Sequence, residues 1–425
     1  MRRGSLRTGR TAAAGCLVAA LALGAGACGG GNDNGGGGGG GAQGKTLDIY
    51  SSLPEQGAQR TQTKAVEDGI KLALEQHGNK AGNFKIKYTP MDDSTAQAGE
   101  WTPEATQANA RKAAQDENVA GYIGEFNSGA SAISIPVLNE AGVPMISPAN
   151  TAVGLTSDAP GHAPGEPQKY YPTGTRNYTR IVPKDTIQAA ALATLMKKDG
   201  CTKVELTNDK EVYGAGLARN LQLAAKSIGL NIIANDATDK NAPNYRSLAA
   251  KAKSAGADCF IFSGITAANG VQVYKDFAAA LPNAKLYGPD GVAESGFIDP
   301  KEGGIPPSVA SRVKVSVATL SPSQYPPQGK QFFKEFTQKY GIKHPDPYAI
   351  YGYEAASLLL DAIKRSGTGS KQDIIKALFN TKDRQSVLGT YSIDKNGDTT
   401  LTDYGIYKIS NGELKFDQTI KANAE

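Results

Sequence analysis

The sequence has few of the residues that build metal centres and catalytic triads. Three histidines and four cysteines occur among 425 residues. The histidines stand far apart and the cysteines form no C-x-x-C pair, which excludes the common zinc sites. Neither G-x-S-x-G nor S-x-x-K occurs in a convincing place, and no histidine lies near a serine motif, which argues against a serine hydrolase. We therefore expect no metal, no cofactor and no catalytic residue.

A complete dinucleotide-binding fingerprint is also missing. The stretch ELTND…YGAGLAR imitates the strand, glycine loop and helix of that fold. Arg219, however, occupies the place of the third small residue, which the close packing of helix and strand requires. A secreted α/β enzyme is the alternative from another class, and the missing catalytic parts count against it.

Positive charge is scarce once the first 27 residues are set aside. The whole chain has a formal net charge of +5, but residues 1–27 hold four arginines and no acid, so the remainder carries +1. No basic patch is left that would neutralise phosphates. We therefore expect no nucleic-acid partner.

The N-terminal 44 residues have the composition of a targeting segment followed by a tether. Residues 1–27 combine a basic start with an apolar run too short to span a membrane, and residues 28–44 are rich in glycine. The order resembles a bacterial lipoprotein signal, which implies cleavage before Cys28 and a lipid anchor on its sulfur. Ala25 departs from the usual leucine, and an ordinary secretory signal is the alternative. Either reading places the mature chain outside the cytoplasmic membrane.

Two cysteines remain in the mature body, Cys201 and Cys259. Each stands just ahead of an apolar, strand-like run. In an oxidising compartment they can form a disulfide if the two strands are neighbours, and the alternative is a pair of buried free thiols.

From residue 45 onward, strand patterns alternate with helix patterns. This alternation predicts parallel sheets covered by helices on both faces, and an irregular loop over 156–176 divides it into two similar α/β lobes. Tyr170 and Tyr171 of that loop can lean over a cleft between the lobes. The predicted helices cover residues 63–78, 103–117, 132–142, 186–200, 213–229, 245–256, 269–281, 328–341 and 353–367. The predicted strands cover residues 46–53, 84–93, 119–129, 143–151, 203–209, 230–238, 257–264, 284–291, 389–394, 403–410 and 414–419.

A pattern that occurs twice in the sequence predicts where a ligand binds. Residues 121–151 and 259–291 share one plan: a strand, a loop of small polar residues, a helix, a strand and a loop that contains proline. In open α/β sheets, ligands bind outside the carboxyl ends of the strands. The loops at those ends are therefore expected to converge on one cleft between the lobes.

The two sets of loops differ in chemistry. The first lobe offers backbone N–H groups and hydroxyls around Ser128, Ser131, Ala149 and Thr151, which suit an anion. The second lobe offers the carboxylate of Asp290, which suits a cation. Together they suit the zwitterion of an α-amino acid. The alternatives are that the serine and threonine only cap helices and that Asp290 only completes a Pro-Asp-Gly turn.

Three stretches carry a family resemblance: GVPMISPANTAVGLT, DKEVYGAGLARNLQ and LYGPDGVAESGF. They resemble the leucine/isoleucine/valine-binding family of type I periplasmic solute-binding proteins, and the resemblance covers nearly all of the mature chain. It implies two doubly wound α/β lobes joined by three hinge crossings, with the ligand cleft between them. It also implies a monomer that captures an amino acid outside the membrane and delivers it to an ABC permease.

The resemblance further implies the lobe boundaries. The first lobe comprises residues 45–181 and 319–403, and the second comprises residues 182–318 and 404–425. The expected crossings lie near Ile181–Pro183, Val317–Leu320 and Asp403–Ile406.

Site residues follow from the same resemblance. Ser128 matches a serine that binds the α-carboxylate, and Ala149 and Thr151 match positions that contact the carboxylate and ammonium. Tyr213 matches a tyrosine that reaches into the cleft, and Asp290 matches an acid that pairs with the ammonium. Asp290 is one methylene shorter than the glutamate that is common at its position, and two other positions also depart from the pattern. Ile265 stands where an aromatic residue is common, and Gln62 lies in a loop that aligns poorly, so it is expected only beside the site. The resemblance therefore does not determine the ligand side chain. Short amides, urea-like compounds and aromatic acids are alternative ligands, and a role as a sensor is an alternative function.

Overall fold

A computed structural model describes residues 44–421 of the protein. The predicted signal segment 1–27, the lipidation site Cys28 and most of the predicted tether lie outside these residues. No helix within the described range is both long enough and apolar enough to cross a membrane.

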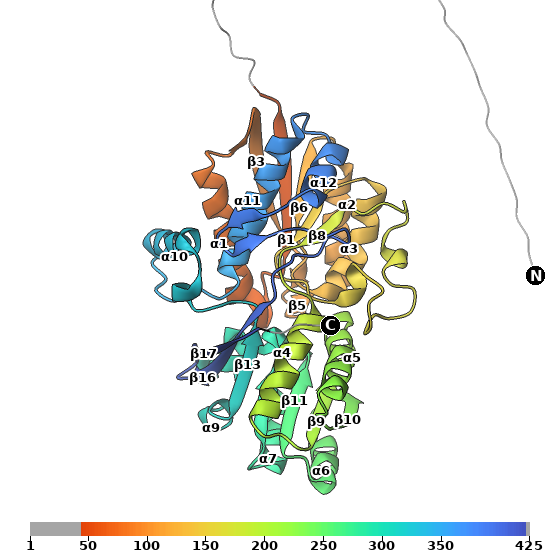
Figure 1. The fold of residues 1–425 in the computed structure, drawn as a ribbon, viewed down its shortest axis with the longest axis vertical. Coiled ribbons are helices and arrows are strands. Elements are labelled where there is room, and N and C mark those ends of the chain that lie inside the picture. Colours follow the sequence, from red (N-terminus) through yellow and green to blue (C-terminus); the bar gives the residue numbers. More distant parts are fainter. Residues whose placement is uncertain (1–43, 422–425) are drawn as a thin grey trace, which may run out of the picture. The chain divides into compact units, whose positions relative to one another are not determined.

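The first sheet has six strands in the order β2-β3-β1-β6-β7-β8, and all neighbours except the β2–β3 pair are parallel. Side chains alternate between its faces, so the adjacent residues Ile49 and Tyr50 belong to different apolar clusters. Ile49 packs with α1 and α11, and Tyr50 packs with α2 and α3, so helices cover both faces (Figure 1). The strands are β1 (Thr46–Leu53), β2 (Lys80–Ala81), β3 (Phe84–Asp92), β6 (Val119–Ile123), β7 (Met145–Ser147) and β8 (Tyr178–Arg180). The helices are α1 (Arg60–Gln76), α2 (Pro103–Gln115), α3 (Ser128–Glu140), α11 (Ala349–Ser366) and α12 (Lys371–Phe379).

The second sheet has seven strands in the order β10-β9-β11-β12-β13-β16-β17. Consecutive residues of β11 from Phe260 to Phe262 are fully buried, which indicates a strand covered on both faces. The strands are β9 (Val204–Asn208), β10 (Ile232–Ala237), β11 (Cys259–Ser263), β12 (Lys285–Gly288), β13 (Val313–Val317), β16 (Asp403–Ser410) and β17 (Glu413–Lys421). Its helices are α4 (Asp185–Lys198), α5 (Val212–Ser227), α6 (Arg246–Ala255), α7 (Gly270–Ala280), α8 (Ser295–Ile298) and α9 (Pro307–Ala310).

The α/β fold is confirmed, but the second sheet is not parallel throughout. β16 runs antiparallel to β13 and to β17. Asn411 and Gly412 join β16 to β17 with positive φ at both positions, the geometry of a tight hairpin turn that Asn-Gly favours. Three further elements, β8, β13 and α12, were not predicted from the sequence. β8 and β13 are short, and α12 begins after a cap in which Ser370 accepts a hydrogen bond from the Asp373 N–H.

The remaining elements connect these bodies or lie at their edges. Helix α10 (Pro327–Tyr340) packs against α11. Two small antiparallel pairs are β4 (Ser94–Thr95) with β5 (Glu100–Trp101) and β14 (Arg384–Ser386) with β15 (Gly389–Tyr391).

The chain passes between the two sheets three times. The first passage follows β8 and precedes α4, and the second follows β13 and precedes α10. The third leads into β16, which begins at Asp403, the start of the stretch near which this crossing was predicted. That passage lies just before β16, after Gly397, whose carbonyl accepts a hydrogen bond from the Arg180 N–H at 2.9 Å.

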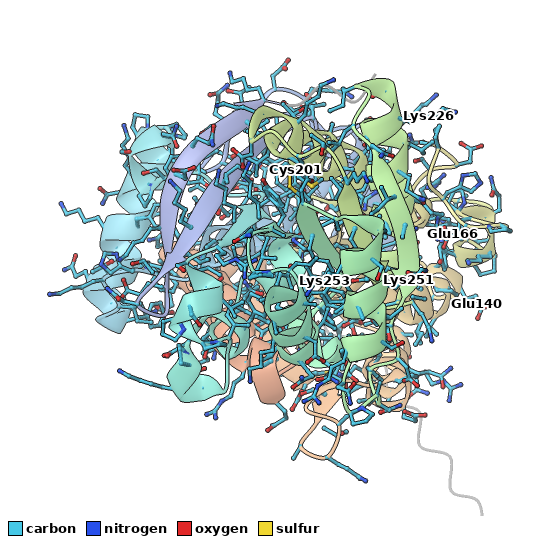
Figure 2. All side chains as sticks on the ribbon, turned by 90° about the horizontal axis from the view of Figure 1, so that it is seen from below. Glu140, Glu166, Cys201, Lys226, Lys251 and Lys253 are labelled. Atoms are coloured by element: carbon cyan, nitrogen blue, oxygen red, sulfur yellow. A yellow bond between two sulfur atoms is a disulfide. The ribbon has the colours of Figure 1, made fainter. Side chains whose placement is uncertain are left out.

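A disulfide joins Cys201 to Cys259, whose Cα atoms are 5.8 Å apart. Cys259 begins β11 and Cys201 precedes β9, and these two strands are neighbours in the second sheet. Figure 2 shows the bonded sulfur atoms in yellow beside the Cys201 label.

The 156–176 loop does not lean over a cleft as Tyr170 and Tyr171 suggested. Both rings are buried in the apolar cluster beside α3. The Tyr170 hydroxyl donates to Glu166 Oε1 at 2.6 Å, and the Tyr171 hydroxyl donates to the Leu155 carbonyl at 2.7 Å. A 3₁₀ turn at Val153–Leu155 precedes the loop, and a second at Gln168–Tyr170 lies within it.

Candidate functional site

A cavity of about 30 Å³ lies between the loops of the two sheets. All six residues predicted to bind a ligand line it: Ser128, Ala149, Thr151, Tyr213, Ile265 and Asp290. Five further residues line it that were not predicted as contacts: Gln59, Gln62, Phe126, Asn127 and Gly291. The free volume is about the share of one water molecule, so the lining must move apart to admit an amino acid.

The first side of the cavity is built from the start of α3 and the loop after β7. Ser128 is the first residue of α3, and the side chain of Asn127 before it makes no capping hydrogen bond. The Ser147 hydroxyl accepts hydrogen bonds from the N–H groups of Ala149 and Asn150, at 3.2 and 2.9 Å. Asn150 in turn donates to the carbonyls of Glu125 and Phe126. This network holds the two loops in a fixed relation.

Ser131 was predicted to offer its hydroxyl to a ligand on this side, but the hydroxyl bonds within the protein. Its hydroxyl accepts a hydrogen bond from the Glu125 N–H at 3.1 Å and donates to Asn150 Oδ1. It supports the loops and does not line the cavity.

A fully buried arginine fixes the same loop from behind. Arg180 donates from Nε to Asp398 Oδ1 at 2.8 Å and from a terminal nitrogen to the Ala152 carbonyl at 2.7 Å. Lys184 Nζ lies 3.0 Å from the other oxygen of Asp398. Burial opposes ionisation of Asp398, but the charges of Arg180 and Lys184 hold its pKa below the usual value. The positive charges of Arg180 and Lys184 are therefore paired with Asp398, and neither residue lines the cavity.

The second side of the cavity presents Asp290. Its carboxylate accepts three hydrogen bonds, from Gln188 Nε2 at 2.6 Å, from the Tyr213 hydroxyl at 2.7 Å and from the Tyr348 hydroxyl at 2.5 Å. None of these hydrogen bonds comes from the turn that holds Asp290. No salt bridge within residues 44–421 involves it. The plain-turn alternative does not account for a carboxylate held by three neutral donors.

The two phenols that face Asp290 remain donors at ordinary pH. Burial raises the pKa of Tyr213 and of Tyr348 well above the usual value, and the negative charge of Asp290 adds to both shifts. Phe126 packs edge-on against Tyr348 with ring centroids 5.5 Å apart, which orients that phenol.

A second carboxyl group lies near Asp290, at the start of α4. Asp185 is fully buried, and its N–H donates to the Thr151 carbonyl at 2.8 Å. Burial raises the pKa of Asp185 to about 7, the Thr151 side chain opposes this rise, and the charge of Asp290 adds to it.

Several of these residues left little or no signal in the sequence. Gln188 is a buried polar residue of α4 among alanines and leucines, and this contrast could have marked it as a site residue. Tyr348 and Arg180 are ordinary in their local sequence. Gln62 was expected only beside the site, but it lines the cavity because α1 begins directly below the loops.

Two α/β bodies that enclose a small cavity, with neutral donors on one side and a carboxylate on the other, define a small-molecule-binding protein. A family model described as periplasmic binding protein matches residues 51–413. The chain belongs to that family, which confirms the resemblance recognised from its motifs.

Individual relatives agree with this assignment. The Leu/Ile/Val-binding protein homolog 1 of Brucella melitensis is 26% identical over 367 residues, which cover 85% of this chain and 89% of the relative. The fold matches the leucine-binding protein LivK of Thermotoga maritima with a TM-score of 0.76 and 22% identity, over 88% of this chain and 99% of the other. A solute-binding protein of Rhodopseudomonas palustris, solved with p-hydroxybenzoic acid, matches with a TM-score of 0.72 and 19% identity, over 89% and 98%.

Proposed function

We propose that the protein is the extracytoplasmic substrate-binding component of an ABC importer and captures an amino acid of the branched-chain or a similar type. Asp290 carries the proposal, because a buried carboxylate that meets neutral donors and no protein cation is a partner for a ligand ammonium. The names of the relatives support the same ligand class.

In this proposal Ser128, Ala149 and Thr151 bind the α-carboxylate through N–H groups and hydroxyls, and Asp290 binds the ammonium. Tyr213 holds the Asp290 carboxylate, and Ile265 contacts the ligand beside it. Asp290 is one methylene shorter than glutamate, so the ammonium approaches it closely or through a water molecule.

Binding requires the two bodies to separate and close again. We assign residues 45–181 with 319–403 to one lobe and residues 182–318 with 404–425 to the other. Closure places Tyr348 of the first lobe on Asp290 of the second, and Lys240 Nζ 2.5 Å from Glu100 Oε1 across the same junction. The ligand stabilises this closed arrangement because it contacts both lobes at once.

Delivery follows from the closed shape, which a membrane permease reads. Lipidation of Cys28 would tether the protein beside that permease on the outer face of the membrane, where the monomer acts alone.

The test compares leucine with 4-methylpentanoate, which has the same carbon skeleton without the ammonium. The purified protein is first unfolded and refolded to remove carried-over ligand, and its thermal midpoint is then measured. At one hundred times its dissociation constant, leucine should stabilise the fold by about 2.7 kcal/mol, whereas the acid should not. A shift with 4-methylpentanoate alone would contradict the role of Asp290.

Aromatic acids are the second candidate ligands, because the Rhodopseudomonas palustris structure has the same fold and holds p-hydroxybenzoic acid. The carboxylate of such an acid suits the Ser128 side, and its hydroxyl would donate to Asp290. Stabilisation by 4-hydroxybenzoate and not by any amino acid would replace the first candidate with this one.

A further inference from the structure

Two buried hydrogen-bond acceptors of the cavity lining have no partner in the protein. Gln59 and Asn127 line it, with 2% and 8% of their surfaces exposed. Gln59 Oε1 and Asn127 Oδ1 are buried and have no hydrogen-bond partner. Buried amide oxygens are normally paired, so this lining is suited to a ligand that brings N–H donors.

Gln62 lines this cavity and donates hydrogen bonds to two residues of a larger one. Its Nε2 donates to the Ala293 carbonyl at 3.4 Å and to Asp346 Oδ2 at 3.5 Å, and both bonds are long. Ala293 and Asp346 line a second cavity of about 560 Å³. A small movement of the Gln62 side chain would therefore connect the two spaces.

The inner wall of the second cavity is acidic. Glu294 lines it and is 1% exposed, and neither of its carboxylate oxygens has a hydrogen-bond partner. Burial raises the pKa of Glu294 to about 8, Thr266 opposes the shift, and the negative charges of Asp346 and Asp290 add to it. No salt bridge within the described part of the chain involves any of these three acids.

Basic side chains also line this cavity, but they belong to its outer part. Lys343, His344 and Lys415 are exposed, and Lys415 forms an ion pair with Glu413. The buried wall therefore lacks a cation, while the solvent side has several.

On the basis of the amino-acid-binding function proposed above, we propose that the ligand is a basic and not a branched-chain amino acid, whose side-chain ammonium or guanidinium lies beside Gln59, Gln62 and Glu294. Its carbon chain would run past Phe126 and Ile265, the apolar residues of the lining. A hydrocarbon side chain would instead leave the buried acceptors unpaired, which disfavours leucine relative to a basic amino acid.

The first experiment measures calorimetric binding of lysine and norleucine, which share a carbon chain and differ in the terminal ammonium. Lysine should bind at least about 10-fold more tightly, the usual effect of one hydrogen bond to a charged group. Lysine should also release protons at pH 7, because a cation beside Glu294 lowers its pKa. The release is read by comparing phosphate and Tris buffers.

The matched variants are Glu294→Gln and Glu302→Gln, which remove a buried and an exposed carboxylate from the same segment. Glu294→Gln should abolish both the preference for lysine and the proton release, and Glu302→Gln should leave both unchanged. Should Glu294→Gln fail to fold, Asp346→Asn gives the same reading with a smaller reduction in the preference for lysine.

The outcomes separate this inference from the proposed function. Equal or tighter binding of norleucine or leucine overturns the proposed side-chain site beside Glu294, while the amino-acid-binding function stands. Absence of binding by any α-amino acid overturns the proposed function itself and, with it, the side-chain site. A preference for lysine that survives both Glu294→Gln and Asp346→Asn also overturns the assignment.

Discussion

The Ser128 side and the Asp290 side of the cavity balance their charges in opposite ways. Behind Ser128 and Thr151, the buried charges of Arg180 and Asp398 neutralise each other, and only neutral groups reach the cavity. On the opposite side, Asp290, Asp185 and Glu294 are buried without a salt bridge among residues 44–421. The charges on the Ser128 side are thus balanced within the protein. The carboxylates on the Asp290 side have no cationic partner in the protein, and a bound ligand would supply one.

This difference separates stability from affinity. Substitutions of the charged residues on the Ser128 side should mainly affect folding, since those charges already have partners. Substitutions of the carboxylates on the Asp290 side should mainly affect ligand binding and its dependence on pH.

Arg180→Met should have the largest effect. The substitution leaves Lys184 as the remaining cation beside Asp398 and leaves the Ala152 carbonyl without its donor, and losing one partner of a buried ion pair costs about 3–5 kcal/mol. Urea unfolding measures the loss. Lys251→Met is the control, because its pair with Asp236 is solvent-exposed, and it should show no measurable change. Equal effects of the two substitutions (Lys251 is labelled in Figure 2) would contradict the comparison.

Asp290→Asn should come next and should act on affinity. Removing the charge that meets the ligand ammonium weakens amino-acid binding by about 2–5 kcal/mol. The fold should persist, because the amide oxygen still accepts hydrogen bonds from Tyr213 and Gln188. Calorimetry with the preferred amino acid measures the loss. Retained affinity in a folded variant would show that the ammonium lies elsewhere.

The stability of the ligand-free protein should fall as pH rises from 5.5 to 8. The pKa of Asp185 is raised to about 7 and that of Glu294 to about 8, in both cases chiefly by burial. The folded state therefore keeps protons that the unfolded state releases. The stabilisation is complete below the unfolded pKa values and is lost as pH rises through the folded ones. Each group should contribute about 2 kcal/mol of this loss between pH 5.5 and 7.

Unfolding curves at several pH values test this dependence. Asp185→Asn should flatten the profile, whereas Asp373→Asn, at an exposed helix cap, should not. A profile that rises with pH over this window would contradict the assignment of raised pKa values.

Ser128→Ala should have the smallest effect. Its hydroxyl is one of several neutral groups on its side, so losing it should weaken binding by about 1 kcal/mol. Calorimetry on the folded variant measures this value. A loss of binding free energy as large as that of Asp290→Asn would contradict the comparison, because the Ser128 side would then contribute as much to binding as the Asp290 side.

Local sequence predicted the position of the cavity because of a general property of parallel sheets. The carboxyl ends of parallel strands meet at one edge, so loops such as those holding Ser128 and Asp290 converge whatever the details of packing. The same reasoning failed for Ser131 and for Tyr170 and Tyr171. Residue type indicates what a side chain offers, but not which neighbour uses it.

The sequence by itself determined the α/β alternation, the family and the six predicted residues of the cavity lining, because each depends on patterns within short segments. The tertiary structure alone decided which distant groups complete the site. Tyr348 lies 58 positions from Asp290, and Arg180 lies 218 positions from Asp398. Such pairs form only when the chain has crossed between the two sheets, and no local pattern records them. The charge balance of the cavity, and with it the proposed preference for a basic ligand, is a property of those long-range contacts.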